Sequence, residues 1–515
     1  MKLNKIILIA SAVVFLAACT KLEEKFFSET TSSGPGGGGG SNAAALLQGA
    51  YASLNNPFVD QSRVWAAQEQ SSDEAVGPTR GGDWDDNGVW RVFHSHKWNS
   101  EHGFLTDTYR ELAQAQFAAT TVLDNNPSAV QAAEARFIRA LAMSAVLDMW
   151  DQVPFRSTSV GDLTKTMPEV KKGTAATDYI ISELTAAIPA LLASGMGRAN
   201  KDGAKALMMK LYLNKGVYAN RASPTFAAAD MNQVITLADQ ILAGSYSLGT
   251  NFFDNFAPTN NIIGTELIYT LNHDNATGFG GNNQSRWYCG LHYNQTPSGW
   301  NGFTTLGDFY DKFEAIDKRR GGTYTGLTNV TGLRTGLLFG QQFDQNNVAL
   351  KDRKGAPLSF TKEVKLKETG ANLEVTGVRV IKYVPDLARQ FPADNDYVIF
   401  RLADVLLMKA EAILRGGTAT NVAPYGNSAA SIVNYIRTHS TRGVAALGTV
   451  DLNAVFDERG REFYWEGWRR SDMIRFGKFL AARQLKGVTG NERLLFPIPN
   501  EQLTINPNLT QNPGY

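Results

Sequence analysis

The stretch Ala204-Lys205-Ala206-Leu207-Met208-Met209-Lys210-Leu211-Tyr212 decides the fold class of this chain. Its apolar residues recur at i, i+3, i+4, i+7 and i+8, which places Ala204, Leu207, Met208, Leu211 and Tyr212 on one face of a helix. The small alanine side chains allow a second helix to approach closely, as paired helices in repeat proteins require. The stretch therefore predicts a helix that packs against another helix.

Similar apolar stripes extend in both directions from this helix. They predict two helical blocks, at about 104–245 and 400–482, with stripes at 105–123, 132–149, 179–192, 231–242, 402–413, 432–436 and 455–480. Paired helices with small residues at their contacts are typical of tetratricopeptide-like repeats. No clean period of about 34 residues is present, so any repeats are degenerate. The predicted fold class is mainly α.

The composition changes between about residues 251 and 396. Gly, Asn, Thr and aromatic residues become more frequent, and β-branched runs such as 373–381 predict short strands. This pattern indicates an irregular, loop-rich subdomain inserted between the two helical blocks of a single domain over 42–515. Loops on a rigid scaffold commonly carry binding sites.

The N-terminus has the pattern of an exported lipoprotein. Lys2 and Lys5 precede an apolar run over 6–16 that is too short to span a bilayer, and Leu16-Ala17-Ala18-Cys19 follows. We expect a signal peptide over 1–18, acylation of Cys19, and a flexible Gly-rich tether over 19–41. The alternative is a plain secretory signal in which a cysteine happens to follow two alanines.

The overall composition limits the partners. A net charge of +1 over 515 residues gives no bulk field that favours nucleic acid. Once Cys19 is acylated, Cys289 has no second cysteine to pair with, so no intrachain disulfide is expected. After the signal peptide, no segment has the run of apolar residues that a membrane-spanning helix needs.

Two clusters of aromatic residues lie in polar segments rich in Gly, Asn and Asp. They contain Trp65, Trp84, Trp90 and Trp98, and Trp287, Tyr288, Tyr293 and Trp300. Sugar rings present flat C–H faces edged by hydroxyl groups, and exposed aromatic rings beside amides, carboxylates and guanidinium groups bind them. The alternative for any single tryptophan is that it anchors its loop to the core. The predicted ligand contacts are Trp84, Trp90, Trp287, Tyr288 and Trp300, with Asp73, Arg80 and Asp83 as polar companions.

Three histidines are candidates for metal ligands. His94 and His96 could share one face of a strand, with His102 nearby. No carboxylate or cysteine at a familiar ligand spacing completes the set, which favours a structural role. The sequence therefore predicts no metal and no cofactor.

Three glutamates could in principle act in glycoside hydrolysis. Glu458, Glu462 and Glu466 are spaced at i, i+4 and i+8 on a predicted helix. Each has an arginine neighbour that would keep its carboxylate ionised, whereas a catalytic acid needs a raised pKa. The motifs of serine hydrolases, zinc proteases and P-loop NTPases are also missing. We expect a structural ion-pair helix and no enzyme activity.

Several segments together resemble the SusD/RagB family of outer-membrane nutrient-binding lipoproteins. The most specific are 401–412 (Arg-Leu-Ala-Asp-Val-Leu-Leu-Met-Lys-Ala-Glu-Ala) and 458–477 (Glu-Arg-Gly-Arg-Glu-Phe-Tyr-Trp-Glu-Gly-Trp-Arg-Arg-Ser-Asp-Met-Ile-Arg-Phe-Gly). The C-terminal segment 496–515 is similar to the usual family ending. The segments 134–140 and 197–206 are similar to its first helical repeats. The resemblance covers nearly the whole chain after the signal peptide.

This resemblance implies a scaffold of four degenerate tetratricopeptide-like units with an irregular ligand-binding face. It implies a non-catalytic, cell-surface lipoprotein that captures oligosaccharide. It also implies delivery to a SusC-like, TonB-dependent outer-membrane transporter, over which the lipoprotein sits as a hinged lid. The segment 21–25, acidic just after Cys19, is similar to surface-export signals of this group. The expected location is therefore the extracellular side of the outer membrane.

Two other functions remain open at this point. The same scaffold could capture peptides instead of sugars, as some relatives of the family are thought to do. A surface glycosidase is the third reading, although the sequence supplies no catalytic signature for it.

Overall fold

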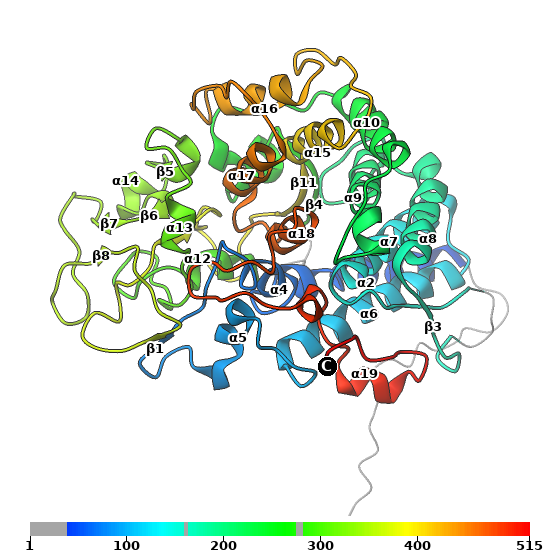
Figure 1. The fold of residues 1–515 in the computed structure, drawn as a ribbon, viewed down its shortest axis with the longest axis horizontal. Helices are drawn as coiled ribbons and strands as arrows, with labels where there is room; N and C mark the ends of the chain where they lie inside the picture. Colours follow the sequence, from blue (N-terminus) through cyan, green and yellow to red (C-terminus); the bar gives the residue numbers. More distant parts are fainter. Residues whose placement is uncertain (1–38, 159–162, 274–281) are drawn as a thin grey trace, which may run out of the picture. The chain divides into compact units, whose positions relative to one another are not determined.

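Helices that pack against their sequence neighbours form the scaffold of the computed structural model, which describes residues 39–158, 163–273 and 282–515 (Figure 1). The first block contains α6 (Gly103–Asp124), α7 (Ala129–Trp150), α8 (Gly173–Ala187), α9 (Lys201–Ala219) and α10 (Ala228–Leu242). Each packs against the next, and α10 packs against α15 (Leu402–Leu414), which contacts α16 (Ala429–Thr438) and α17 (Leu452–Phe463). This arrangement confirms the predicted fold class, a mainly α, tetratricopeptide-like scaffold.

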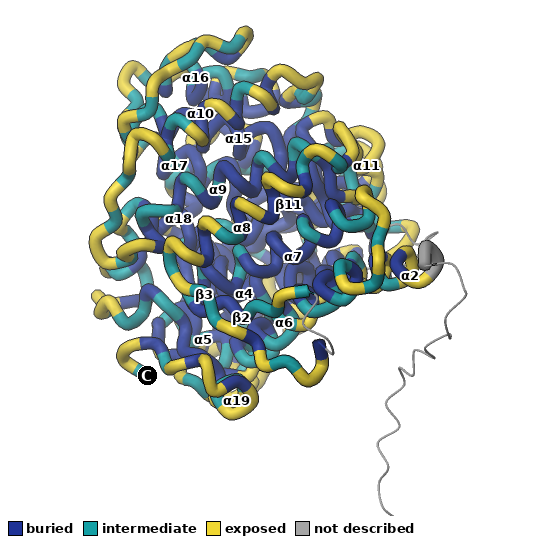
Figure 2. Tube along the Cα trace, turned by 90° about the vertical axis from the view of Figure 1, so that its right-hand side faces the viewer, coloured by how far each residue is buried: buried dark blue, intermediate teal, exposed yellow. Residues whose placement is uncertain are grey.

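Side-chain caps and small residues explain how these helices begin and pack. The Ser128 hydroxyl accepts a hydrogen bond from Gln131 N, and the Asn200 side chain accepts one from Gly203 N. Each cap satisfies a backbone amide that the first helical turn leaves unpaired. Figure 2 shows α7, α9 and α15 largely buried. The alanines expected at helix contacts are wholly buried, namely Ala204, Ala206, Ala410 and Ala412.

A buried network of ion pairs joins α17 to the loop-rich region. The Glu462 carboxylate accepts hydrogen bonds from Arg401 at 2.7 Å and Arg319 at 3.0 Å, and it also pairs with Arg442. All four side chains are at most 1% exposed. Burial alone would raise the pKa of Glu462, but the guanidinium groups of Arg442 and Arg401 hold that pKa well below its ordinary range. The prediction of structural ion pairs is confirmed for this cluster.

The prediction of one helix over 455–480 is wrong. α17 ends at Phe463, and α18 (Arg469–Arg475) begins after a turn in which Trp465 has φ 62° and Gly467 φ 85°. Left-handed backbone of this kind ends a helix. Glu466 therefore lies outside the helix, but its carboxylate still binds Arg401 at 2.7 Å.

Short strands organise the loop-rich region between α10 and α15. β4 (Leu267–Leu271) pairs antiparallel with β11 (Tyr397–Arg401), and β10 (Arg379–Ile381), β6 (Thr335–Leu338) and β5 (Gly321–Gly322) form a sheet in that order. β7 (Gly340–Gln341) pairs with β8 (Ser359–Phe360) in the same region. Outside it, between α7 and α8, β2 (Val153–Phe155) pairs with β3 (Glu169–Lys171). Short helices lie between them or follow them: α11 (Asn260–Ile263), α12 (Ser285–Tyr288), α13 (Gly307–Tyr310), α14 (Thr328–Thr331) and α19 (Asn500–Ile505).

One strand pair ties the N-terminal segment to this region. β1 (Thr79–Arg80) pairs in parallel with β9 (Lys367–Glu368), and Val76 forms a bridge with Thr304. These pairings place the segment that follows α4 (Val64–Glu69) against loops more than two hundred residues later in the chain.

Among the described residues, four helices precede the long helices, and the apolar stripes do not predict them. They are α2 (Gly39–Ala52), α3 (Asn55–Val59), α4 (Val64–Glu69) and α5 (Val89–Ser95). α2 begins inside the segment expected to be a tether over 19–41. The expected signal peptide, Cys19 and the rest of the tether lie outside the described residues. Across the described ranges, no helix combines the length and apolarity needed to cross a membrane.

Candidate functional site

The two aromatic clusters of the sequence meet in the structure. Trp84 follows β1, and its Nε1 donates a hydrogen bond to the carbonyl oxygen of Trp300, 2.9 Å away. The centroids of the two rings are 6.3 Å apart. The β1–β9 pair and the bridge between Val76 and Thr304 hold the two segments at this distance.

A row of stacked aromatic rings reaches the surface at this place. Trp300 is 46% exposed and Phe391 is 62% exposed. Tyr288 lies between them, with its ring centroid 5.8 Å from that of Trp300 and 4.7 Å from that of Phe391. We call Trp84, Tyr288, Trp300 and Phe391 the aromatic platform. Large aromatic rings that stay together and exposed mark a binding surface.

Polar groups border the aromatic platform. The Tyr288 hydroxyl donates to Gln390 Oε1 at 2.8 Å, and the Tyr293 hydroxyl donates to Asp83 Oδ2 at 3.1 Å. The Arg353 guanidinium lies over the Tyr293 ring, 3.9 Å from its centroid. Amide, carboxylate and guanidinium groups supply the donors and acceptors that match a pattern of hydroxyl groups.

Four of the predicted ligand contacts are buried: Tyr288, which is 6% exposed and lies between the exposed rings, and three that lie behind the platform. Trp287 is wholly buried, and Trp90 is 3% exposed and donates its Nε1 hydrogen to Asp86. Arg80 is 4% exposed and donates to the carbonyl oxygen of Leu373 at 2.9 Å. These last three side chains hold the loops that carry the platform, and none presents a face to a ligand in this conformation. The burial of these side chains supports the alternative interpretation, in which they anchor their loops to the core.

Asp73 belongs to a different surface. Its carboxylate accepts two hydrogen bonds from Arg469, at 2.7 and 3.0 Å. Burial raises the pKa of Asp73, but the charge of Arg469 outweighs this and the pKa is lowered overall. Asp73 lines an open depression of about 520 Å³ together with Lys312 and Arg483. Of the predicted contacts, Trp84, Tyr288, Trp300 and Asp83 are therefore the ones brought together at the platform.

The platform also contains a residue that the sequence analysis missed. Phe391 lies outside the two aromatic clusters, in the polar segment 388–394. Its exposed ring and its stacking on Tyr288 show its place in the row. The signal in the sequence was a lone aromatic residue before a proline, in a stretch with no helical stripe.

The histidines that are candidates for metal ligands contact main-chain carbonyl groups instead. His94 lies on α5, and His96 follows it, so the predicted strand is wrong. His94 Nε2 is 2.9 Å from the carbonyl oxygen of Gln484, and His96 Nε2 is 2.9 Å from that of Ser71. Burial lowers the pKa of His94 to about 4. Within the described ranges, no group of three or more His, Cys, Asp or Glu side chains is placed to hold a metal ion.

Two buried glutamates support the start of the segment that leads to Trp84. Glu69 Oε1 accepts a hydrogen bond from Gly467 N at 2.6 Å, and Glu74 Oε2 accepts one from Trp465 N at 3.1 Å. Burial raises the pKa of Glu69 to about 7. Burial and the neighbouring Glu69 carboxyl group raise the pKa of Glu74 well above its ordinary range. The pair therefore holds protons near neutral pH.

This pair makes the stability depend on pH. The folded protein binds protons at Glu69 and Glu74 more tightly than the unfolded chain, where a glutamate has a pKa of about 4.3. The free energy of unfolding therefore falls as the pH rises from about 4.3 to about 7, because the unfolded chain releases these protons first. Each glutamate contributes a slope of about 1.4 kcal/mol for every pH unit in this range. We expect Glu74→Gln to make this fall shallower and to stabilise the protein above pH 7.

Urea unfolding at a series of pH values measures this effect. The exposed control Glu101→Gln should follow the wild-type curve. Curves for wild type and Glu74→Gln that run parallel across this range would contradict the raised pKa of Glu74.

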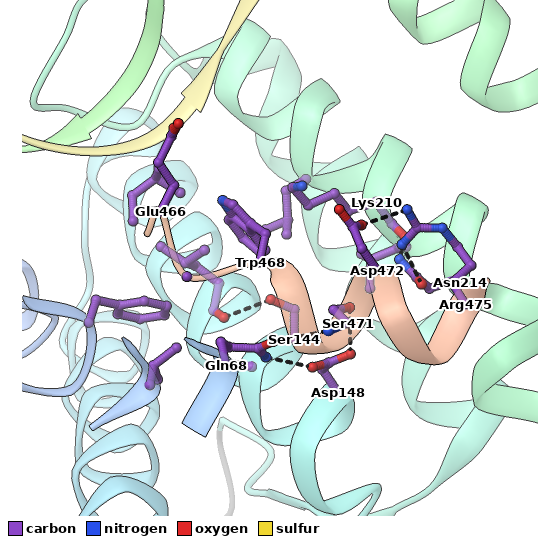
Figure 3. A pocket seen from close by; sticks show the side chains of 18 of the residues that line it. Gln68, Ser144, Asp148, Lys210, Asn214, Glu466, Trp468, Ser471, Asp472 and Arg475 are labelled. Atoms are coloured by element: carbon purple, nitrogen blue, oxygen red, sulfur yellow. Dashed lines mark hydrogen bonds and ion pairs between the residues drawn. The ribbon is translucent and has the colours of Figure 1, made fainter. Parts of the chain in front are cut away.

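A small internal cavity lies among α4, α7, α9 and α18, and Figure 3 shows its polar lining. Gln68 Nε2 and the Ser471 hydroxyl donate to Asp148 at 2.8 and 2.9 Å, and Arg475 donates to Asn214 at 3.1 Å. Its volume of about 60 Å³ is enough for a few water molecules. Because its polar side chains pair with one another inside the scaffold, this cavity is a packing feature of the helices.

Several known proteins are similar to this chain in sequence. The sequence profile of the SusD family matches residues 265–492. The starch-binding protein SusD of Bacteroides thetaiotaomicron is 28% identical over 435 residues, which cover 75% of this chain and 73% of that protein. The SusD-like protein P25 of Formosa agariphila is 25% identical and covers 80% of each chain.

Solved structures of low sequence identity share the fold. A laminarin-binding SusD-like protein superposes with a TM-score of 0.68 at 20% identity, covering 92% of this chain and 99% of that one. Surface glycan-binding protein A from Bacteroides thetaiotaomicron, solved with laminarihexaose, gives a TM-score of 0.66 at 16% identity over the same shares of the two chains.

Proposed function

Because this chain belongs to the SusD family, we propose that it is a non-catalytic protein that binds oligosaccharide at the aromatic platform. The observation that carries the proposal is the pair of exposed rings of Trp300 and Phe391, which stack on the buried Tyr288 ring between them and lie beside polar side chains. Flat aromatic faces pack on the C–H faces of sugar rings, and the polar border satisfies ring hydroxyls. The starch-binding and laminarin-binding relatives support a glycan as the ligand class.

The proposal that the protein is not an enzyme rests on its relatives and on its carboxylates. The relatives are described as binding proteins. Burial raises the pKa of Glu458, but the neighbouring arginines outweigh burial and lower it to about 2, which keeps the group ionised. A glycosidase needs one carboxyl group that stays protonated until it donates to the leaving oxygen. Glu458 and Glu462 are unsuited to that step.

We further propose that the protein is anchored to the outer membrane through acylated Cys19, facing the extracellular side, and hands glycan to a SusC-like, TonB-dependent transporter. The lipobox-like sequence before Cys19 and the family membership support this placement. The Gly-rich stretch after Cys19 would let the folded body move as a lid without detaching. Incorporation of a labelled fatty acid that is lost in Cys19→Ser tests the anchor.

Calorimetry against a panel of ligands tests the function. The panel contains α- and β-linked glucans, other plant and algal oligosaccharides, and peptides from a protein hydrolysate. We expect binding of at least one oligosaccharide, no peptide binding, and no new reducing ends after prolonged incubation. Binding of peptides alone would favour a peptide-capture protein on the same scaffold, and release of reducing ends would establish a glycosidase.

A further inference from the structure

A second cavity lies between α2, the start of α7 and β4. Its volume is about 400 Å³, near the lower end of the range of about 300–1,000 Å³ that is typical of small-molecule sites. Figure 1 shows α2 and α12 apart, so the cavity is separate from the aromatic platform. Its lining includes Leu47, Tyr51, Gln131, Arg198, Tyr269 and Leu271.

A buried hydroxyl group at the cavity has no partner among the residues that the structure describes. Tyr269 is wholly buried and lines the cavity, and its hydroxyl makes no hydrogen bond to any described residue. A buried polar group that is left unpaired has lost its hydrogen bonds to water without replacement, so such a group usually has a partner. A ligand in the cavity would supply one.

The charges at the cavity wall are already balanced. The wholly buried Glu134 carboxylate accepts hydrogen bonds from Arg198 Nη2 at 2.6 Å and Nε at 3.2 Å, and from the Tyr51 hydroxyl at 2.5 Å. The Tyr51 hydroxyl accepts in turn from Ala199 N at 3.0 Å. Because this network leaves no net charge, it favours a neutral ligand over an anion or a cation.

The rest of the lining alternates amides with apolar groups. Gln48, Asn55 and Gln131 bring side-chain amides to the cavity, and Leu47 and Leu271 bring apolar surface. Amides bind hydroxyl groups as both donor and acceptor, and the leucines and the Tyr51 ring can cover C–H groups. These are the requirements of a small polyhydroxylated molecule.

From this cavity we propose a second binding site, which takes a neutral mono- or disaccharide and uses the Tyr269 hydroxyl as a hydrogen-bond partner. The volume favours one or two sugar rings over a longer chain. The site goes beyond the function proposed for the platform, and it stands or fails independently of that function.

Saturation-transfer NMR and calorimetry with glucose, galactose, mannose, N-acetylglucosamine and maltose test the proposal on the mature chain. Two variants change the cavity. Tyr269→Phe removes the buried hydroxyl and keeps the ring, and Ala44→Trp places a bulky side chain in the cavity lining, at an exposed position of α2. Trp300→Ala is the matched control, because it alters the platform alone. The melting temperature of each variant reports whether it folds, and Tyr269→Phe should be at least as stable as wild type.

We expect one of the five sugars to bind wild type and Trp300→Ala equally. Tyr269→Phe should weaken that binding about tenfold, which corresponds to about 1.4 kcal/mol, and Ala44→Trp should abolish it. The absence of binding by all five sugars would overturn the proposal, and so would binding that survives either cavity variant. Binding of a small sugar that is lost in Trp300→Ala would assign it to the platform and would equally overturn the second site.

Discussion

Replacement of Trp300 by alanine is expected to lower the affinity for oligosaccharide by about 30-fold, or about 2 kcal/mol, the size typical of a central aromatic contact. Trp300 is the exposed tryptophan of the platform, and its stacking on Tyr288 keeps the row in place. The change removes the flat surface for a sugar ring and leaves the buried side chains that anchor the loops untouched. Calorimetry with the tightest ligand of the panel measures the effect.

A matched control separates this effect from a general loss of exposed aromatic surface. Phe339 is also 46% exposed, but its ring lies against that of Tyr310, with the centroids 5.3 Å apart, and it is outside the platform. Phe339→Ala should leave the affinity unchanged. Equal affinities for wild type and Trp300→Ala, both with native melting temperatures, would remove the platform from the proposed function.

Replacement of Arg401 by methionine is expected to lower the free energy of unfolding by about 3–5 kcal/mol. The Arg401 guanidinium donates to Glu466 at 2.7 and 2.9 Å, to Glu462 at 2.7 Å and to Glu266 at 3.0 Å. Methionine fills much of the space but leaves these buried carboxylates with fewer cationic partners. Urea unfolding monitored by tryptophan fluorescence measures the change.

Arg110→Met is the control for the same chemical change at the surface. Arg110 is 39% exposed in its side chain and pairs with Asp107 one turn earlier on α6. Exposed pairs of this kind contribute about 0–1 kcal/mol. If Arg401→Met cost no more than Arg110→Met, the buried ion pairs would not be what fixes α17 against the loop-rich region.

The helical part of the fold was predictable because its signal is local. The stripe at 204–212 and its counterparts predict α6 to α10 and α15 from side-chain spacing alone. The break between α17 and α18 was missed because the stripe continues through it. The turn depends on left-handed backbone at Trp465. Because tryptophan rarely adopts that conformation, its presence in the sequence does not predict a turn.

The candidate site was only partly predictable because it is built from distant segments. Composition identified Trp84 and Trp300 but could not separate them from Trp90 and Trp287, which occur in the same polar loops. Burial decides between them, and burial depends on contacts such as that between Trp90 and Phe303, whose ring centroids are 4.7 Å apart. The residue pattern within one loop cannot predict such a contact, because the two residues lie in distant segments.

The central claim is that the aromatic platform is where this protein holds oligosaccharide. A crystal structure of the mature chain with the tightest oligosaccharide of the panel tests it most directly. We predict a sugar ring stacked on the exposed face of Trp300 or Phe391, with its hydroxyl groups near Asp83 or Gln390. A well-ordered ligand bound elsewhere, with the platform bare, would contradict the claim.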